Sequence, residues 1–190
     1  MYLLRSFTRL TTVLVAAGVL FLVPVAAQAD HETSALSAQE GTWAVVETMW
    51  PSPDAAPQIS KGLVADRRMV GNLLEETLHS PGINRPLRID YLGYDAMAGQ
   101  WRYVSIETRV PVAPMSASSF DRDPADRVTV RFDPFAAPPI GPGWAGRFLR
   151  MEEVIARDGS DHETKDQYFI LADGTARRWL VHRYDYRRLH

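Results

Sequence analysis

The sequence predicts an all-β protein, an antiparallel up-and-down β-barrel of about eight to ten strands. From residue 41 onward, apolar and polar residues alternate in short segments that Gly, Asp and Pro separate, which is typical of strands with one buried face. The Asp-Gly pairs at 158–159 and 173–174 lie between such segments and indicate tight hairpin turns. No segment of helical periodicity alternates with the strands, which excludes parallel α/β folds.

The alternation predicts the strands in chain order. It is clearest at Val128, Val130 and Phe132, which are separated by polar residues. The expected strands are 41–50, 59–68, 72–80, 87–95, 100–110, 114–120, 126–133, 147–157, 163–172 and 175–186. The same strands could form a sandwich, and we expect the barrel because sequential hairpins close on themselves and closure removes exposed sheet edges.

Three segments interrupt the strand pattern. Residues 33–40 are expected to form one short helical turn, capped by Thr33 or Ser34. Segments 51–58 and 134–146 are rich in proline, which donates no hydrogen bond to a sheet. We therefore expect these two segments to be long loops at the rim of the barrel.

The first 29 residues are typical of a secretory signal peptide. Arg5 and Arg9 precede an apolar run over 11–25, and Ala27–Ala29 form a small-residue cleavage site. The alternative is a membrane anchor, which needs roughly 20 apolar residues, and this run is shorter. We expect a periplasmic or secreted bacterial protein, with cleavage after Ala29.

The expected signal peptide, 1–29, is followed by a flexible N-terminus, 30–36, and by a single barrel domain over 37–190. No later apolar run is long enough to span a membrane, so we expect no integral membrane segment after cleavage. The sequence does not indicate an oligomeric state.

Composition excludes several classes of function. The 190 residues include 21 basic and 23 acidic ones and no Cys, so the sequence has no disulfide, no thiolate metal site and no charge pattern for nucleic acid. The five His residues form no metal-binding motif, and we expect no metal and no cofactor. Gly141–Gly146 match G-x-G-x-x-G, but a strand is expected to follow them, so we infer no dinucleotide site.

Four expected strands each place one glutamate on a face that is otherwise apolar or aromatic: Glu47, Glu76, Glu107 and Glu153. A buried carboxylate must be paired or protonated, because desolvation disfavours its charge. Two interpretations remain open. The carboxylates form Arg–Glu pairs that fill a small barrel, or they are polar anchors of a ligand cavity.

We expect at least two of these four carboxylates to point inward, alongside Trp101, Tyr103 and Arg178. The full set of candidate cavity residues is Glu47, Glu76, Tyr91, Trp101, Tyr103, Glu107, Glu153, Arg178, His182 and Tyr184.

Gly41-Thr42-Trp43 follows the expected helical turn and opens the first strand. It resembles the G-x-W start of lipocalin-like (calycin) barrels. In those folds the Trp closes the barrel floor, and a basic residue of the last strand packs across it. The resemblance implies that Trp43 is a structural floor residue and that Arg183, or Arg187, is its partner.

Leu92–Asp95 (Leu-Gly-Tyr-Asp), followed by Gly99–Trp101, resembles the hairpin of the bacterial "domain of unknown function 1579" family. The turn and strand over Met69–Glu76, and the Asp173-Gly174 hairpin that leads into Tyr184, are also similar to that family. The resemblance covers roughly residues 37–187. It implies a lipocalin-like barrel and brings no established activity, so the function must be argued from the site.

Three hypotheses follow for the function. We expect an exported barrel that binds a small, partly apolar or amphipathic molecule, because a barrel of about eight strands can hold one such ligand. The alternative is an enzyme of isomerase, cyclase or hydrolase type that uses acid–base chemistry in the same cavity. The sequence contains neither a G-x-S-x-G motif nor a Cys nucleophile that would support this alternative. A further alternative is a filled barrel that acts as a protein-interaction module, with Trp144 exposed on a loop.

Overall fold

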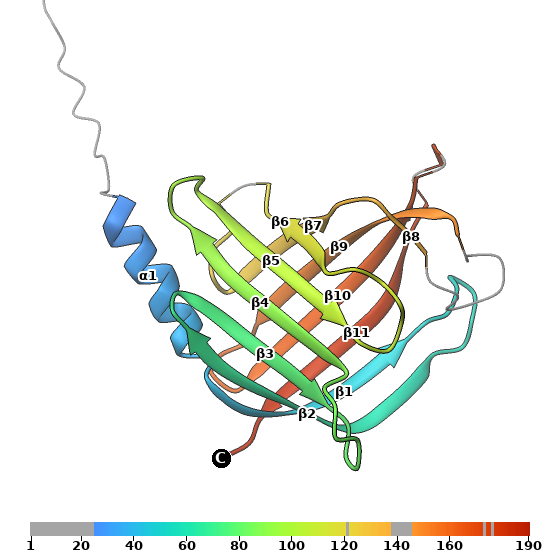
Figure 1. The fold of residues 1–190 in the computed structure, drawn as a ribbon, viewed down its shortest axis with the longest axis horizontal. Helices are drawn as coiled ribbons and strands as arrows, with labels where there is room; N and C mark the ends of the chain where they lie inside the picture. The colour runs from blue at the N-terminus through green and yellow to red at the C-terminus, as the bar shows by residue number, and fades with distance from the viewer. Residues whose placement is uncertain (1–24, 121, 138–145, 173, 176) are drawn as a thin grey trace, which may run out of the picture.

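The computed structural model describes residues 25–190 apart from 121, 138–145, 173 and 176. Within these residues the chain forms a closed antiparallel β-barrel with one helix at one end (Figure 1). The expected all-β barrel is therefore confirmed. Most of the expected signal peptide, and the loop that carries Trp144, lie outside the described residues.

The described residues form one helix and eleven strands, whose bounds are α1 (Val25–Ser37), β1 (Gly41–Met49), β2 (Gln58–Val70), β3 (Leu73–His79), β4 (Arg88–Asp95), β5 (Gln100–Glu107), β6 (Met115–Ser118), β7 (Arg127–Phe132), β8 (Phe135–Ala136), β9 (Phe148–Arg157), β10 (His162–Leu171) and β11 (Arg178–Arg188). Each strand except the short β8 was expected from the alternation of apolar and polar residues.

The strands follow an up-and-down order. Each strand from β1 to β6 pairs with the next, β9 pairs with both β7 and β10, and β11 pairs with both β10 and β1. These pairings close a ring of ten strands, since β8 pairs only with the start of β9. Closure leaves the ten main strands without a free edge, which is the physical advantage of a barrel over an open sheet.

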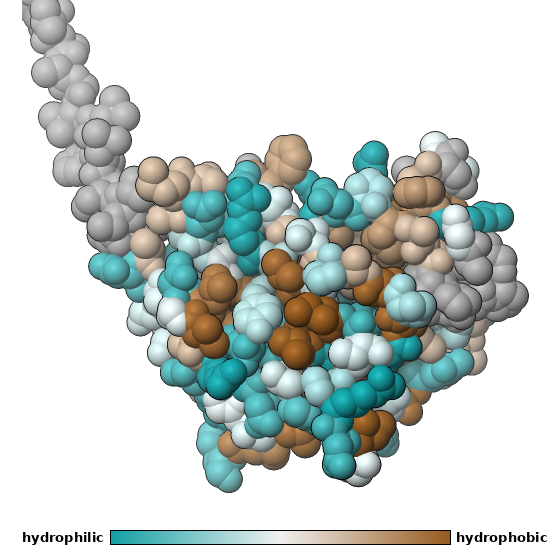
Figure 2. Space-filling view, viewed as in Figure 1, coloured by the Kyte–Doolittle hydropathy of each residue, from teal (hydrophilic) through white to brown (hydrophobic). Residues whose placement is uncertain are grey.

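The inner and outer faces of the strands follow the period-2 pattern of the sequence. In β10, residues alternate between buried and half-buried along the whole strand. The face of the barrel shown in Figure 2 is largely hydrophilic, with apolar side chains scattered over β3, β4 and β5. A β-bulge between β1 and β2 shifts the register after Val45, and Gly62 there has a φ of 77°, which favours glycine.

The helix differs from the expectation. It spans Val25–Ser37 instead of 33–40, so residues 30–36, which we expected to be flexible, are helical, and Thr33 lies inside the helix and does not cap it. Ala, Gln and Glu in this segment favour a helix. Leu36 is fully buried in the main apolar cluster of the barrel, which fixes the end of the helix against the strands.

Two strand bounds also differ. Phe135–Ala136, inside the segment 134–146 that we expected to be a loop, pairs with the first residues of β9, because the antiparallel β7 ends before it reaches them. The last strand begins at Arg178 and runs to Arg188, beyond the expected end at 186. The additional residues pair with the start of β1, where Trp43 is aligned with Arg188.

The end of the barrel beside α1 is closed by Trp43. Its side chain is fully buried, and its indole N–H donates to the carbonyl oxygen of Gln39 at 3.1 Å. The guanidinium carbons of Arg67 and Arg188 lie 4.7 Å and 4.4 Å from the centre of its ring. Arg188 also donates to the carbonyl oxygen of Ala38 at 2.7 Å, and so ties the end of the last strand to the end of the helix.

The basic partner of Trp43 is therefore Arg188, and the assignment of Arg183 or Arg187 was wrong. Arg183 points outward and forms two hydrogen bonds with Asp166, at 2.7 Å and 2.6 Å. Arg187 is exposed as well. The inner face near the end of β11 carries Tyr184 and Tyr186. Alternation therefore turns Arg183 and Arg187 outward and brings Arg188 to the closed end.

Candidate functional site

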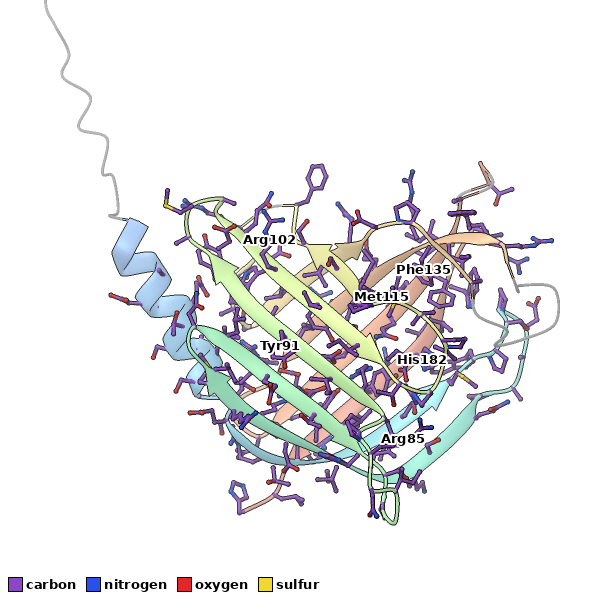
Figure 3. The ribbon with its side chains drawn as sticks, in the orientation of Figure 1. Arg85, Tyr91, Arg102, Met115, Phe135 and His182 are labelled. Carbon is purple, nitrogen blue, oxygen red and sulfur yellow. The ribbon has the colours of Figure 1, made fainter. Side chains whose placement is uncertain are left out.

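The opposite end of the barrel, which we call the mouth, contains a cavity of about 300 Å³. This volume lies at the lower end of the range for small-molecule sites. Met115, Phe135 and His182 lie around it (Figure 3). The lining side chains are Glu47, Met49, Gln58, Ser60, Arg88, Ser105, Glu107, Arg109, Val110, Val112, Met115, Phe135, Met151, Gln167, Phe169, His182 and Tyr184.

The cavity is amphipathic. Its apolar lining comes from strands and loops far apart in the sequence, namely Met49, Val110, Val112, Met115, Phe135, Met151 and Phe169. The rings of Phe135 and Phe169 meet edge to face, with centres 5.8 Å apart, which makes part of this wall rigid. Charged and polar side chains line the remainder, so a ligand with one apolar and one polar part would match both.

Glu47 is the centre of the polar lining. Its carboxylate accepts hydrogen bonds from Tyr184 Oη at 2.8 Å and from Arg109 Nη1 at 3.0 Å, and His182 Nδ1 lies 3.0 Å from Oε1. Burial alone would raise the pKa of Glu47. The close contact with His182, the charge of Arg109 and the hydrogen bond from Tyr184 together outweigh burial and lower the pKa to about 2. Glu47 is therefore a fixed anion at neutral pH.

Arg109 joins two carboxylates at the mouth. It follows β5 and donates to Glu107 through Nε at 2.9 Å and Nη2 at 2.8 Å, while Nη1 contacts Glu47. Its Nη2 also lies 3.3 Å from Tyr184 Oη. The ring of His182 stacks on Tyr184 with an interplanar angle of 11°. These contacts hold the polar side of the cavity in one arrangement before any ligand arrives.

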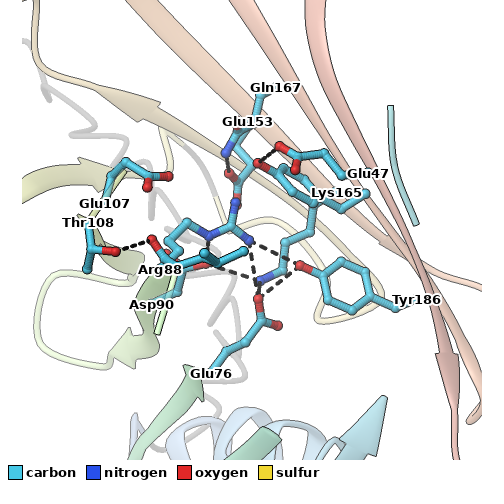
Figure 4. A network of polar contacts seen from close by, with 12 residues as sticks. Glu47, Glu76, Arg88, Asp90, Glu107, Thr108, Glu153, Lys165, Gln167 and Tyr186 are labelled. Carbon is cyan, nitrogen blue, oxygen red and sulfur yellow. Dashed lines mark hydrogen bonds and ion pairs between the residues drawn. The ribbon is translucent and has the colours of Figure 1, made fainter. Parts of the chain in front are cut away.

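Below the cavity, the barrel is filled by a buried network of charges (Figure 4). Glu76 accepts from Arg67 Nε at 2.7 Å and from Tyr186 Oη at 2.9 Å, and Lys165 Nζ lies 2.9 Å from it. Burial raises the pKa of Glu76, but the charges of Lys165, Arg67 and Arg88 overcome it and hold the pKa well below its usual range. Arg67 also donates to Glu163 at 2.6 Å.

Glu153 is the exception in this network. It is fully buried, and Gln167 donates to its Oε2 at 2.6 Å, but its Oε1 has no hydrogen-bond partner among the described residues. No ion pair to Glu153 within 4.0 Å occurs in the described part of the chain. Burial therefore dominates and raises the pKa of Glu153. The same residue type thus has opposite properties at two buried positions, because Arg67, Lys165 and Arg88 lie within 4.0 Å of Glu76, whereas the charges of Lys165 and Arg88 act on Glu153 only from farther away.

The structure places the predicted residues in three groups: in the cavity lining, inside the barrel but outside that lining, and on the outer surface. Glu47, Glu107, His182 and Tyr184 line the cavity. Glu76, Trp101, Tyr103 and Glu153 are buried inside the barrel but outside the cavity lining. All four glutamates thus lie inside the barrel.

Two predicted residues lie on the outer surface and do not reach the cavity. Tyr91 faces outward from β4 and donates to Glu75 at 2.7 Å (Figure 3). Arg178 is exposed, donates to Glu152 at 2.8 Å and packs on the ring of Tyr168. Arg178 was expected to point inward, but the neighbouring Trp179 is the buried residue, and alternation turns Arg178 outward.

Sequence reasoning missed several buried charges, chiefly Arg67, Arg88, Asp90, Glu163 and Lys165. The signal that found the four glutamates was also present for them. Arg67 follows Leu63 and Ala65 at two-residue spacing, and Lys165 precedes Gln167 and Phe169 on the same face. Cations at these positions of an apolar face therefore indicate partners for the buried glutamates.

The fold and the cavity define a closed, lipocalin-like antiparallel barrel with an amphipathic site at its mouth. No protein-family model matches the chain, and no curated protein is similar to it. The resemblance to the "domain of unknown function 1579" family therefore stays a prediction.

Two further findings concern the described residues alone. None of their helices is long and apolar enough to cross a membrane. No three acidic or His side chains among them are grouped so that they would hold a metal ion.

Proposed function

We propose that the barrel binds one small, partly apolar molecule in the cavity at its mouth. The observation that carries this proposal is the amphipathic lining of the 300 Å³ cavity, with Met, Val and Phe side chains on one side and the Glu47–Arg109 group on the other. The closed end of the barrel is filled, so a ligand would enter from the mouth. Ligand pockets are typically apolar with a few fixed polar groups, as here.

Acid–base catalysis in the same cavity is the second candidate, and one observation favours it. His182 lies beside the carboxylate of Glu47, an arrangement that fixes a ring for proton transfer. Glu47 itself is a poor base, because its pKa of about 2 lies far below neutral pH and its oxygens already accept bonds from Arg109 and Tyr184. Burial raises the pKa of Tyr184, which makes this tyrosine a weaker acid. Binding is thus the better supported function.

The proposed setting is the bacterial periplasm or the extracellular space, after removal of residues 1–29. The order of Arg5, Arg9, the apolar run and Ala27–Ala29 supports export. N-terminal sequencing of the exported protein should begin at Asp30. A chain that keeps its first residues and stays with the membrane would contradict this location.

Native mass spectrometry tests the binding proposal, with two variants of neighbouring residues on β6. Met115 lines the cavity, whereas Ser116 is exposed on the outer face. Met115→Trp should fill part of the cavity, and Ser116→Trp adds the same side chain outside it. Protein from the natural host should carry an additional small-molecule mass, which Ser116→Trp keeps and Met115→Trp loses.

The opposite results have clear meanings. A bound mass that survives in Met115→Trp would place the ligand outside the cavity. The wild-type protein without any bound mass, and without affinity for added apolar compounds, would favour the interaction-module alternative. Turnover of an added compound that His182→Gln abolishes would favour the enzyme.

A further inference from the structure

Arg88 is more deeply buried than the other two basic side chains that line the cavity, Arg109 and His182, and one of its guanidinium nitrogens has no acceptor. The residue is 2% exposed and lies between the cavity and the charge network below it. Its Nε lies 2.8 Å from Asp90, and its Nη2 donates to Tyr186 Oη at 3.1 Å. The guanidinium carbon is 4.3 Å from the centre of the Tyr184 ring. These contacts hold the guanidinium plane in one orientation (Figure 4).

The remaining nitrogen of this group, Nη1, is buried and has no hydrogen-bond partner among the described residues. A buried donor without an acceptor is costly, and the cost is removed when an acceptor arrives. Because Arg88 lines the cavity, a ligand oxygen at the cavity floor can supply that acceptor.

The charges around the cavity indicate which kind of oxygen fits. The two carboxylates that line it, Glu47 and Glu107, share Arg109, and Arg88 lies against Asp90 and Glu76. The cations that line the cavity are thus matched by carboxylates of the protein. A ligand carboxylate would bring a negative charge that no unmatched cation of the described residues balances, and its desolvation would oppose binding.

A ligand ammonium fits no better. It offers only donors, whereas the unused group at the floor is itself a donor. Both oxygens of Glu107 and both oxygens of Glu47 already contact Arg109. An added cation would have to compete with a guanidinium that holds both carboxylates at once.

We infer that the ligand is a neutral, mainly apolar molecule with a carbonyl-type oxygen, and that Arg88 Nη1 donates to this oxygen at the cavity floor. The inference rests on the proposed binding function and names the ligand class for the same site. The apolar part of the ligand packs against Met115, Phe135 and Met151, and the oxygen lies toward the network below.

Calorimetric titration with three probes of equal carbon number tests the inference: methyl octyl ketone, decanoate and decylamine. The wild-type protein should bind the ketone roughly tenfold more tightly than either charged probe, because only the ketone supplies an acceptor without an additional charge. Equal or tighter binding of decanoate or decylamine would overturn the inference and leave the binding function standing. Failure of all three probes to bind would count against the binding function itself.

A matched pair of variants tests the role of Arg88. Arg88→Lys keeps the positive charge but loses the planar group that places a donor at the cavity floor. It should lower the affinity for the ketone roughly tenfold, whereas Arg178→Lys on the outer surface should leave it unchanged. An unchanged affinity in Arg88→Lys would refute the assignment.

The wild-type protein provides a test that does not depend on the folding of a variant. In nitrogen-15 spectra of arginine-labelled protein, the guanidinium resonances of Arg88 should shift when the ketone is added, and those of Arg178 should not. Binding of the ketone without a shift at Arg88 would show that its oxygen lies elsewhere.

Discussion

Glu76 and Glu153 are both fully enclosed in the barrel, so the same Glu→Gln change at each separates the effect of partners from that of burial. Glu76 is held by Arg67 at 2.7 Å, by Lys165 at 2.9 Å and by Arg88 at 3.3 Å. Removing one partner of a buried ion pair typically costs 3–5 kcal/mol. Arg67 keeps Glu163, and the amide keeps one acceptor oxygen, so we expect about 3 kcal/mol for Glu76→Gln, at the lower end of that range.

Glu153→Gln should behave differently. Among the described residues no cation pairs with Glu153, and the amide can still accept the hydrogen bond from Gln167. We expect a change in the free energy of unfolding below about 1 kcal/mol. Urea unfolding followed by tryptophan fluorescence measures both variants under identical conditions. Equal losses in the two variants, or a larger loss in Glu153→Gln, would refute this account of the network.

The difference in stability between wild type and variant should also depend on pH with opposite signs for Glu76→Gln and Glu153→Gln. The pKa of Glu76 is lowered on folding, so its contribution to stability is present above the ordinary value of 4.5 and is lost as pH falls. The difference between wild type and Glu76→Gln should therefore shrink below that pH. The pKa of Glu153 is raised, so it makes the wild type lose stability as pH rises above 4.5, and Glu153→Gln should remove that loss.

Two further predictions concern the closed end of the barrel. Trp43→Ala should lower the free energy of unfolding by roughly 3–5 kcal/mol, as for other fully buried Trp residues. Thermal unfolding measures this loss, and a loss below about 1 kcal/mol would mean that Trp43 does not close the floor. Arg188→Gln should destabilise the protein more than Arg183→Gln, because Arg188 binds both Trp43 and the end of α1 while Arg183 forms an exposed ion pair. The reverse order in a melting experiment would contradict this role of Arg188.

The sequence was most informative where one physical pattern decides the structure. Alternation placed the ten main strands within a few residues of their observed bounds, because each strand has one buried face. It also placed Glu47, Glu76, Glu107 and Glu153 inside. It could not reveal the cavity, because the separation between Glu47 on β1 and Arg109 after β5 depends on how the barrel closes.

Other errors arose where a single position or a short contact decides the outcome. Arg178 and Arg183 were each placed inside, although both lie next to the residue that faces inward. Pairing of Phe135 with Leu149 depends on which strand ends first, and no local pattern encodes it. The opposite behaviour of Glu76 and Glu153 depends on cations that come from β2, β4 and β10, which a single strand does not show.

Binding in the cavity at the mouth is the central claim, and the methionines of the chain provide its most direct measurement. Met49, Met115 and Met151 line the cavity, whereas Met97 is 94% exposed on a hairpin and Met69 packs near the closed end. In carbon-13 spectra of methionine-methyl-labelled protein titrated with methyl octyl ketone, we expect shifts at the first three residues and none at Met69 or Met97. Shifts confined to Met97, or equal at all five residues, would contradict a ligand site inside the mouth of the barrel.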